Sequence, residues 1–507
     1  MKALIVCKES ISSSSHKFID VFSRKGVQGF MFYTEPYEVI VKHPMHEKYS
    51  ELLRVDFCSI FPDGEAKSII NGYLDSLNDP YLPRNFSKSE LNSITEYLNS
   101  YPGLITDINK RRYFKDINKT HVLAYFDMLA EYYDKAINKL KPDLVFDVYP
   151  ENISRIVLDV VLKRHGIKYI CLFHSRYKDY MFLSTSVTRP GEELFERVHK
   201  SITSKYLLKA NHEINNYKKS LNLLNDDEKQ YEKNIHSFSF YKALKLIIGT
   251  ALFTLSSKVK RIDKNWYPRK TDRAFIRVIA DTSFRVIVYN SYITFVKYIR
   301  LRKKHHTPDF SKFYYFPLSY TAEGDGVLTR GSWFSDLDSI NTLRHYLPFD
   351  TSLVMKEHRS MIGERTSSEI NWMNKIPSLK YISASDINHS NPLKLLNESI
   401  GTITLAGTSG LESLLLGKPT LILGNPVYQQ YMKLPSVYDD GFKVVESFFK
   451  SPDDYCADSD SISSYIAALL RDGIKISYSN LLTYNGGNVG DEVFELICDK
   501  VIEVYNI

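Results

Sequence analysis

A short turn in the C-terminal half of the chain has the residue types of a phosphate-binding site. The segment TITLAGTSGLESLLLGKPTLILGN predicts a strand, a small-residue turn, a short helix and a second strand, at Thr402–Leu405, Ala406–Gly410, Leu411–Leu416 and Thr420–Leu423. Such a turn aims backbone N–H groups and the positive end of the helix dipole at one spot. Thr408 and Ser409 would add hydroxyl donors, and Glu412 could accept a hydrogen bond from a ribose hydroxyl. The alternative is that Thr408 or Ser409 only caps the helix.

Cationic residues follow another predicted strand of the same half. Thr351–Met355 is apolar and leads into KEHRSMIGER, so four basic side chains come after the strand: Lys356, His358, Arg359 and Arg365. Such a loop suits a phosphate or a carboxylate. The alternative for a lone histidine after a strand is a structural role. An acidic loop, SYTAEGDG with Glu323, follows the predicted strand at Lys312–Leu318.

The N-terminal half offers acidic and basic groups after two predicted strands. Asp147 and Glu151 lie at the end of Leu144–Val148, and His174 and Arg176 follow Lys168–Phe173. Ligands of parallel sheets bind beyond the carboxyl ends of the strands, so these residues could line an acceptor or catalytic cleft. Helix capping by Glu151 and a surface position for Arg176 remain open as alternatives.

Composition indicates a soluble globular protein of two or more domains. The chain has 507 residues, with 43% hydrophobic and 25% charged residues. Its five cysteines are scattered without a CxxC pair, which suits a reducing cytoplasm. The N-terminal sequence MKALIVCKES turns polar too early for a signal peptide, and no apolar run reaches the roughly 18 to 20 residues that span a bilayer. We therefore expect a cytoplasmic protein.

The net charge of +7 is concentrated in one segment. Between Lys258 and Lys304 there are 14 Lys or Arg residues and three Asp, interleaved with aromatic residues. This pattern is typical of a peripheral membrane surface, a nucleic-acid site or a site for a polyanionic substrate, and equally of a solvated helical face over aromatic core positions. Because no nucleic-acid reader motif accompanies the charge, we favour peripheral contact with anionic lipid on the inner face of the cytoplasmic membrane.

Alternating strand and helix patterns divide the chain into two α/β parts. We predict an N-terminal Rossmann-like domain, a helical basic and aromatic bridging region, a C-terminal Rossmann-like domain and closing helices, at 1–200, 201–307, 308–450 and 451–507. The first predicted strand, Ala3–Cys7, is followed by a Ser-rich turn and no GxGxxG, so a dinucleotide cofactor is not expected.

Three segments of the second half together resemble the capsule polysaccharide biosynthesis family. They are FYYFPLSYTAEGDG, SLVMKEHRSMIGER and TITLAGTSGLESLLLGKPTLILG, within residues 310–430. Some members of that family transfer Kdo (3-deoxy-D-manno-octulosonic acid) from CMP-Kdo. The resemblance implies a GT-B architecture, in which two Rossmann-like domains face a cleft and the C-terminal one holds the nucleotide. The chain is also similar to CMP-sialic acid transferases of that architecture, whose His-Pro and Ser/Thr pairs contact CMP.

Carried over by motif, the resemblance assigns the nucleotide to Lys356, His358, Gly407, Thr408, Ser409 and Glu412, with Glu323 close to the donor. The chain departs from the pattern in two places. Arg359 replaces the Pro after the histidine, and Ala322-Glu323 replaces Pro-Glu.

The sequence thus predicts a glycosyltransferase of surface polysaccharide assembly that transfers an acidic sugar such as Kdo from a CMP-sugar to a glycan or glycolipid. One phosphate can be neutralised by a helix N-terminus with His358 and Lys356, so we expect neither a metal nor a cofactor. Arg359 or Arg176 would pair with the sugar carboxylate, and Asp147 or Glu151 would activate the acceptor. The alternatives are a UDP-sugar, GDP-sugar or CDP-glycerol transferase, or a non-catalytic scaffold of polysaccharide export.

Overall fold

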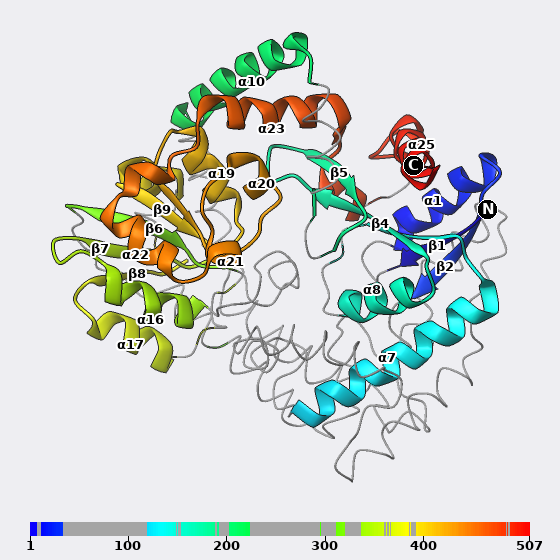
Figure 1. Ribbon diagram of the computed structural model, residues 1–507, viewed down its shortest axis with the longest axis horizontal. Coiled ribbons are helices and arrows are strands. Elements are labelled where there is room, and N and C mark those ends of the chain that lie inside the picture. Colours follow the sequence, from blue (N-terminus) through cyan, green and yellow to red (C-terminus); the bar gives the residue numbers. More distant parts are fainter. Residues whose placement is uncertain are drawn as a thin grey trace.

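The computed structural model shows two α/β units, each built around its own β-sheet (Figure 1). The structure describes residues 1–7, 12–33, 119–148, 150, 154–187, 190–191, 202–223, 295, 311–319, 336–358, 361, 365, 367–384, 386, 392–482, 484 and 487–506.

The first sheet, sheet A, belongs to the N-terminal unit and is mainly parallel. Its strands lie in the order β11-β5-β4-β3-β1-β2, where β1 to β4 are parallel and β5 and β11 are antiparallel to their neighbours. The bounds are β1 Lys2–Cys7, β2 Gln28–Tyr33, β3 Leu144–Val148, β4 Lys168–His174, β5 Tyr180–Ser184 and β11 Ile474–Lys475. The central strand β3 is buried along its whole length, as a strand covered on both faces must be.

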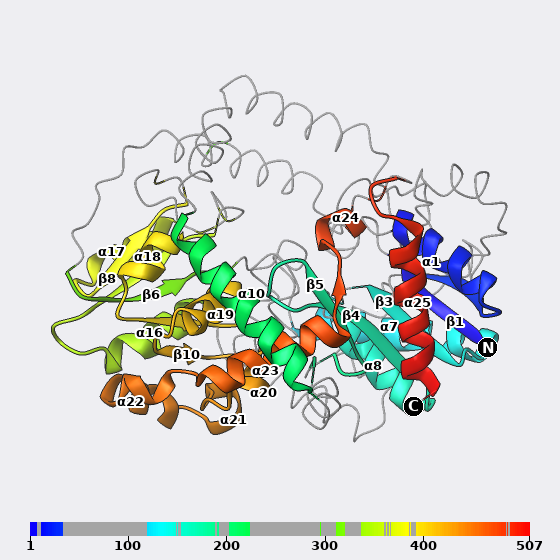
Figure 2. The same ribbon diagram turned by 90° about the horizontal axis from the view of Figure 1, so that it is seen from above.

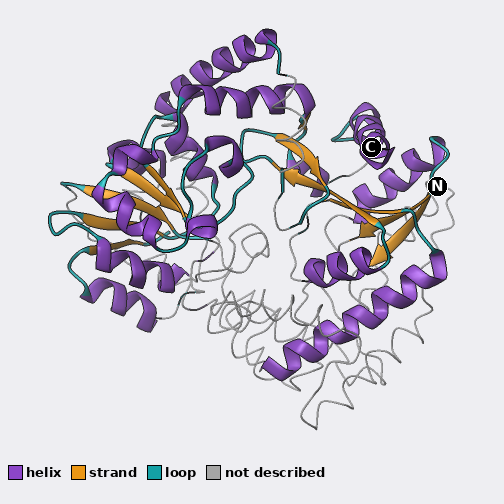
Figure 3. Ribbon diagram, in the orientation of Figure 1, coloured by secondary structure: helices purple, strands orange, loops and turns teal. Residues whose placement is uncertain are grey.

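Helices cover both faces of sheet A (Figure 3). α1 (Ser12–Arg24) and α25 (Asp491–Asn506) lie together on one side, and α7 (Lys119–Leu140) packs beside α8 (Ser154–Arg164) on the other. Apolar residues of α1 and α7 join the same core as the strands, so the helical spacing of these residues places one face of each helix on the sheet.

The second sheet, sheet B, is entirely parallel and has the order β10-β9-β6-β7-β8. Its strands are β6 Phe313–Pro317, β7 Ser352–Lys356, β8 Leu379–Ile382, β9 Gly401–Thr404 and β10 Thr420–Ile422. Alternate residues of β6 enter different cores: Tyr314 and Phe316 one, Phe313 and Tyr315 the other. This two-residue period shows that both faces of sheet B are covered.

Helices of the C-terminal unit contribute apolar side chains to the two cores, one on each face of sheet B. One core takes residues of α16, α17 and α22, and the other takes residues of α18. The bounds are α16 Asp336–Tyr346, α17 Ser367–Lys375, α18 Pro392–Glu398, α19 Thr408–Leu415, α20 Gln429–Met432, α21 Val437–Asp440, α22 Lys443–Lys450 and a 3₁₀ turn, η2, at Pro452–Tyr455.

The last part of the chain returns from the C-terminal unit to the N-terminal one. α23 (Ser459–Asp472) packs along α10 (Ser204–Leu223), and both views show the pair lying side by side (Figures 1 and 2). β11 then adds to the edge of sheet A, and after α24 (Tyr478–Leu482) the helix α25 lies against α1. One apolar core contains Phe182 of β5, Tyr428 of the C-terminal unit and Tyr465 of α23, so the two units share packing.

The fold class predicted from the sequence, α/β with two Rossmann-like sheets, is confirmed. Three details differ from the prediction. Ser12–Ser15 lie inside α1, where the Ser15 hydroxyl donates to the carbonyl of Val6 (3.0 Å), and not in a turn. The antiparallel strand β5 was not predicted, and the last segment contains a strand as well as helices. Apart from α10 and Phe295, the predicted bridging region lies outside the described residues.

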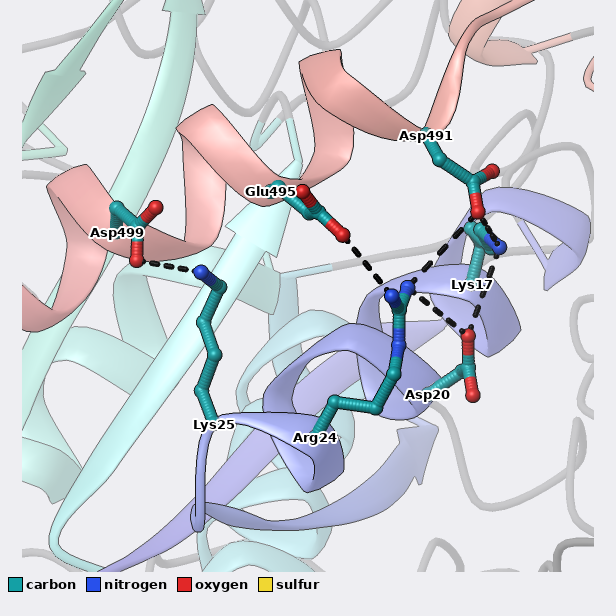
Figure 4. A network of polar contacts seen from close by, with 7 residues as sticks. All are labelled: Lys17, Asp20, Arg24, Lys25, Asp491, Glu495 and Asp499. Atoms are coloured by element: carbon teal, nitrogen blue, oxygen red, sulfur yellow. Dashed lines mark hydrogen bonds and ion pairs between the residues drawn. The ribbon is translucent and has the colours of Figure 1, made fainter.

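The contact between α1 and α25 has an apolar centre and a charged margin. Phe494 is fully buried and meets Phe18 edge to face, with ring centroids 4.9 Å apart. Around it, basic residues of α1 and the turn after it face acidic residues of α25, as Figure 4 shows, including Lys25–Asp499 at 2.6 Å and Arg24–Glu495 at 2.9 Å. Because these ion pairs are half exposed, we expect the aromatic contact to stabilise the docking far more than the charges do.

Replacing Phe494 with Ala should therefore lower the free energy of unfolding by about 3–5 kcal/mol, the usual cost of removing a buried ring. Lys25→Ala at the same interface should cost less than about 1 kcal/mol. Denaturant unfolding of both variants checks this. Equal losses would contradict the apolar account of the interface.

Candidate functional site

The strand order of sheet B reverses beside the predicted phosphate turn. From β6 the chain moves outward to β7 and β8, then crosses back to β9 and β10 on the other side of β6. The connections after β6 and β9 therefore leave toward opposite faces, and ligands of open α/β sheets bind beyond the carboxyl ends of the strands at such a switch point. The turn between β9 and α19, residues 405–407, lies at this switch point.

The helix after this turn begins without a side-chain cap. Gly407 is the N-cap residue of α19 in an extended conformation (φ −80°, ψ 165°), and no side chain makes a capping hydrogen bond. The alternative that Thr408 or Ser409 merely caps the helix is therefore wrong, because both lie inside it. Both residues are partly exposed, and among the described residues no acceptor pairs with their backbone N–H groups. Two N–H groups and two hydroxyls thus remain for a ligand.

Two hydrogen bonds fix the shape of the turn, and a glycine leaves room for one of them. The N–H of Gly407 donates to Thr404 Oγ1 (3.0 Å), and the hydroxyl of Tyr428 donates to the carbonyl of Gly407 (2.9 Å). Gly410 permits this approach, since a Cβ there would stand 2.3 Å from the Tyr428 hydroxyl and 2.6 Å from Thr404 Cγ2. Tyr428 was not predicted from the sequence. The local pattern that could have indicated it is the Asn-Pro turn after β10, which comes just before Tyr428.

Glu412 is partly buried one turn into α19. Tyr217 of α10 donates its hydroxyl hydrogen bond to the Glu412 carboxylate. Burial raises the pKa of Glu412 to about 7, although the hydrogen bond from Tyr217 lowers it. The carboxylate predicted to hold a ribose hydroxyl thus already has a partner from a helix almost 200 residues earlier in the sequence.

Lys356 and His358 lie at the same edge of sheet B as the turn. Lys356 ends β7, is buried at 7% exposure, and its Nζ lies 3.5 Å from the carbonyl oxygen of Ser383. His358 is exposed just beyond it. Because β7 and β9 flank β6, their carboxyl ends lie two strand spacings apart, roughly 10 Å. The structure therefore brings these two residues to the same edge as Gly407, Thr408 and Ser409.

Arg365, the fourth basic residue of that loop, is committed to carboxylates. Its guanidinium donates to Glu357 (2.6 Å) and to Asp336 (2.9 Å), and all three side chains are buried. Burial alone would lower the pKa of Arg365, but the two carboxylates more than offset this and raise it. The expectation that Arg365 binds a ligand anion is corrected by this network, because its charge is already neutralised.

Asp147 is likewise part of a buried network. It is 1% exposed and accepts hydrogen bonds from Arg155 Nε (2.6 Å) and from the Tyr169 hydroxyl (2.8 Å). These contacts tie β3 to α8 and β4. A substrate cannot reach a carboxylate buried in this way, so the placement speaks against the catalytic role predicted for Asp147.

His174 is the last residue of β4, and Arg176 lies in the turn between β4 and β5. The backbone N–H of Arg176 donates to His174 Nδ1 (3.0 Å), and Arg176 has a left-handed backbone (φ 66°). Burial raises the pKa of Tyr428, and the nearby Arg176 guanidinium opposes that rise. Arg176 therefore reaches toward the tyrosine that holds the Gly407 carbonyl. The remaining predicted residues, Glu151, Glu323 and Arg359, lie outside the described residues.

The stretch of the chain that contains this turn matches a known protein family. Residues 295–431 match the family model described as capsule polysaccharide biosynthesis protein. This stretch has the capsule polysaccharide biosynthesis pattern. It runs from the end of the basic segment through sheet B to α20, so the family resemblance predicted from the sequence is confirmed there. Among curated proteins none matches the chain.

Several solved structures align with the chain at low similarity. The Thermosulfurimonas dismutans KpsC beta Kdo 2,7 transferase has 12% identity and a TM-score of 0.35, over 73% of this chain and 89% of its own. The beta Kdo 2,4 transferase of the same KpsC has 15% identity and a TM-score of 0.33, over 71% and 88%. UDP-GlcNAc 2-epimerase of Methanocaldococcus jannaschii has 10% identity and a TM-score of 0.28, over 93% and 99%. At TM-scores below 0.5 these likenesses carry no argument.

In the part of the chain that the structure describes, no group of three or more His, Cys, Asp or Glu residues could hold a metal ion. The expectation of a metal-independent site stays a prediction.

Two of the basic residues of the loop, Arg365 and His358, should differ in how much their substitution changes the stability of the protein. Arg365→Ala leaves buried carboxylates uncompensated and should lower the free energy of unfolding by about 3–5 kcal/mol. His358→Ala removes an exposed side chain and should change it by less than about 0.5 kcal/mol. Thermal or denaturant unfolding measures both. An Arg365 variant of normal stability would restore it as a candidate ligand.

Proposed function

We propose that this protein is a glycosyltransferase of surface polysaccharide biosynthesis that transfers an acidic sugar such as Kdo from a CMP-sugar to a glycan or glycolipid. The observation that carries the proposal is the uncapped N-terminus of α19 at the switch point of sheet B, inside the stretch that matches the capsule polysaccharide family.

A CMP leaving group carries a single phosphate, and the site offers a matching set of donors. The N–H groups and hydroxyls of Thr408 and Ser409 would bind the phosphate oxygens, and Lys356 and His358 would approach from β7. These groups stabilise the negative charge that develops on the phosphate as the glycosidic bond to CMP breaks. A divalent ion is then not required.

The carboxylate that distinguishes an acidic sugar needs a cationic partner. Arg176 fits this role, because it extends from the N-terminal unit toward Tyr428 beside the turn. The acceptor hydroxyl attacks the anomeric carbon and loses its proton to a general base. With Asp147 held by Arg155, Glu151 and Glu323 are the remaining candidates for that base.

Nucleotide titration tests the donor class. We expect CMP to bind at least tenfold more tightly than UMP, UDP or GDP, and donor hydrolysis or transfer to occur with the CMP-sugar. Preference for UDP, GDP or a CDP-alcohol would replace the proposal with another transferase. Absence of any nucleotide binding would favour the scaffold alternative.

The double variant Thr408→Ala/Ser409→Ala tests the site itself. Loss of two hydroxyl donors to a charged phosphate should weaken CMP binding and turnover by about tenfold or more at unchanged melting temperature. Ser459→Ala, the same change at the first, exposed residue of α23, is the matched control. Near-normal transfer by the double variant would remove the nucleotide site from this turn.

We also propose that the basic segment at 258–304 contacts anionic lipid. Its residue Phe295 is 53% exposed, as an aromatic membrane anchor would be. Within the described ranges, no helix has the length and apolar content to cross a bilayer. The protein should co-sediment with vesicles containing phosphatidylglycerol at low salt, less so as salt rises, and not with phosphatidylcholine alone. Failure to bind the anionic vesicles at low salt would end this proposal.

A further inference from the structure

Glu412 lies among tyrosines that come from three different elements. Tyr217 of α10 donates a hydrogen bond to the Glu412 carboxylate. Tyr315 of β6 and Tyr428 of the loop before α20 lie close enough for the negative charge of Glu412 to raise their pKa. Burial of Glu412 raises its pKa, and the hydrogen bond from Tyr217 opposes that rise. A carboxylate in this setting is costly to ionise, and protons bind to it near neutral pH.

Tyr217 is itself held from the N-terminal unit. Its ring meets the Tyr177 ring edge to face, with centroids 5.3 Å apart, and the Lys178 ammonium lies 5.6 Å from the Tyr217 ring centroid. Lys178 also pairs with Glu213, one turn earlier on α10. The hydroxyl of Tyr217 is therefore presented to Glu412 by a packed network, rather than by a loose surface side chain.

The position of Glu412 matters for any anion at the start of α19. Glu412 follows Thr408 by four residues, which is about 6 Å along the helix axis. An ionised carboxylate at that range repels an anion at the N-terminus and opposes the helix dipole that attracts it. A phosphate bound beyond the end of the helix lies farther away, and at about 12 Å with an effective dielectric constant of about 20 the repulsion between two unit charges is worth roughly tenfold in affinity.

We propose that anion binding at the turn is linked to protonation of Glu412: the donor phosphate binds more tightly when Glu412 is neutral, and Tyr217 positions the carboxylate and sets the pH of the change. The proposal rests on the proposed function in taking a nucleotide phosphate as the anion. The direction of the pH effect follows from the repulsion between the ionised carboxylate and the phosphate. As pH rises through neutrality, Glu412 ionises and the affinity for the phosphate falls.

CMP affinity measured by calorimetry from pH 6 to pH 8.5 tests the linkage in four proteins: the wild type, two variants and a control. For the wild type we expect about a tenfold loss of affinity centred near pH 7. Glu412→Gln should lack this loss. Tyr217→Phe should move its midpoint up by roughly half to one pH unit, because the lost hydrogen bond favours the ionised carboxylate. Glu398→Gln, the same change at an exposed position on α18, is the control and should behave as the wild type does. The phosphate of CMP titrates identically in all four.

Two outcomes would overturn the inference while leaving the proposed function intact. One is CMP binding with the same pH dependence in Glu412→Gln as in the wild type. The other is a Tyr217→Phe variant that loses affinity equally at every pH without moving the midpoint, which would make Tyr217 only structural. If the wild type bound no CMP, the proposed function would fail, and the same titrations with inorganic phosphate would decide the linkage. Absence of phosphate binding as well would end the inference.

Discussion

The arrangement of the site depends on one topological constraint, the reversal of strand order between β6 and β9. In a parallel sheet, each connection must cross one face or the other, so a reversal leaves two neighbouring strand ends without a helix between them. The turn, Lys356 and Tyr428 lie at this edge because each lies at or after the carboxyl end of a strand of sheet B, whereas Tyr217 reaches it from α10. The absence of a side chain at Gly410 then allows Tyr428 to approach the backbone closely enough to fix the turn.

Local patterns in the sequence predicted most of the elements that form this site. The bounds of β3 were predicted to the residue, because an apolar run between turn residues leaves little freedom in where a buried strand begins. β5 and the two-residue β11 were missed. β11, the edge strand of sheet A, has only two residues and therefore almost no pattern, and β5 pairs antiparallel between β11 and β4, outside the alternation of strand and helix that predicted the parallel strands.

The role of a charged residue was harder to predict than its location. Arg365 and Asp147 have the residue types of a site, but each is paired inside the protein, and the partners Asp336 and Arg155 gave no local signal of pairing. The contact of Tyr217 with Glu412 joins helices from opposite halves of the chain, so no spacing rule could reveal it. Whether a charge serves the fold or a ligand is decided by tertiary neighbours, which single-sequence patterns do not contain.

The return of the chain to sheet A has a consequence for its biosynthesis. β5 ends at Ser184, whereas the strand that pairs with it, β11, begins at Ile474, and α25 follows later still. At ordinary translation rates, the N-terminal unit must wait on the order of tens of seconds for its own edge strand and for the helix that covers α1. Until then, the edge of β5 and the apolar face around Phe18 are exposed. The first unit to leave the ribosome is therefore the last to be completed, and protecting that unfinished edge falls to the folding machinery of the cell.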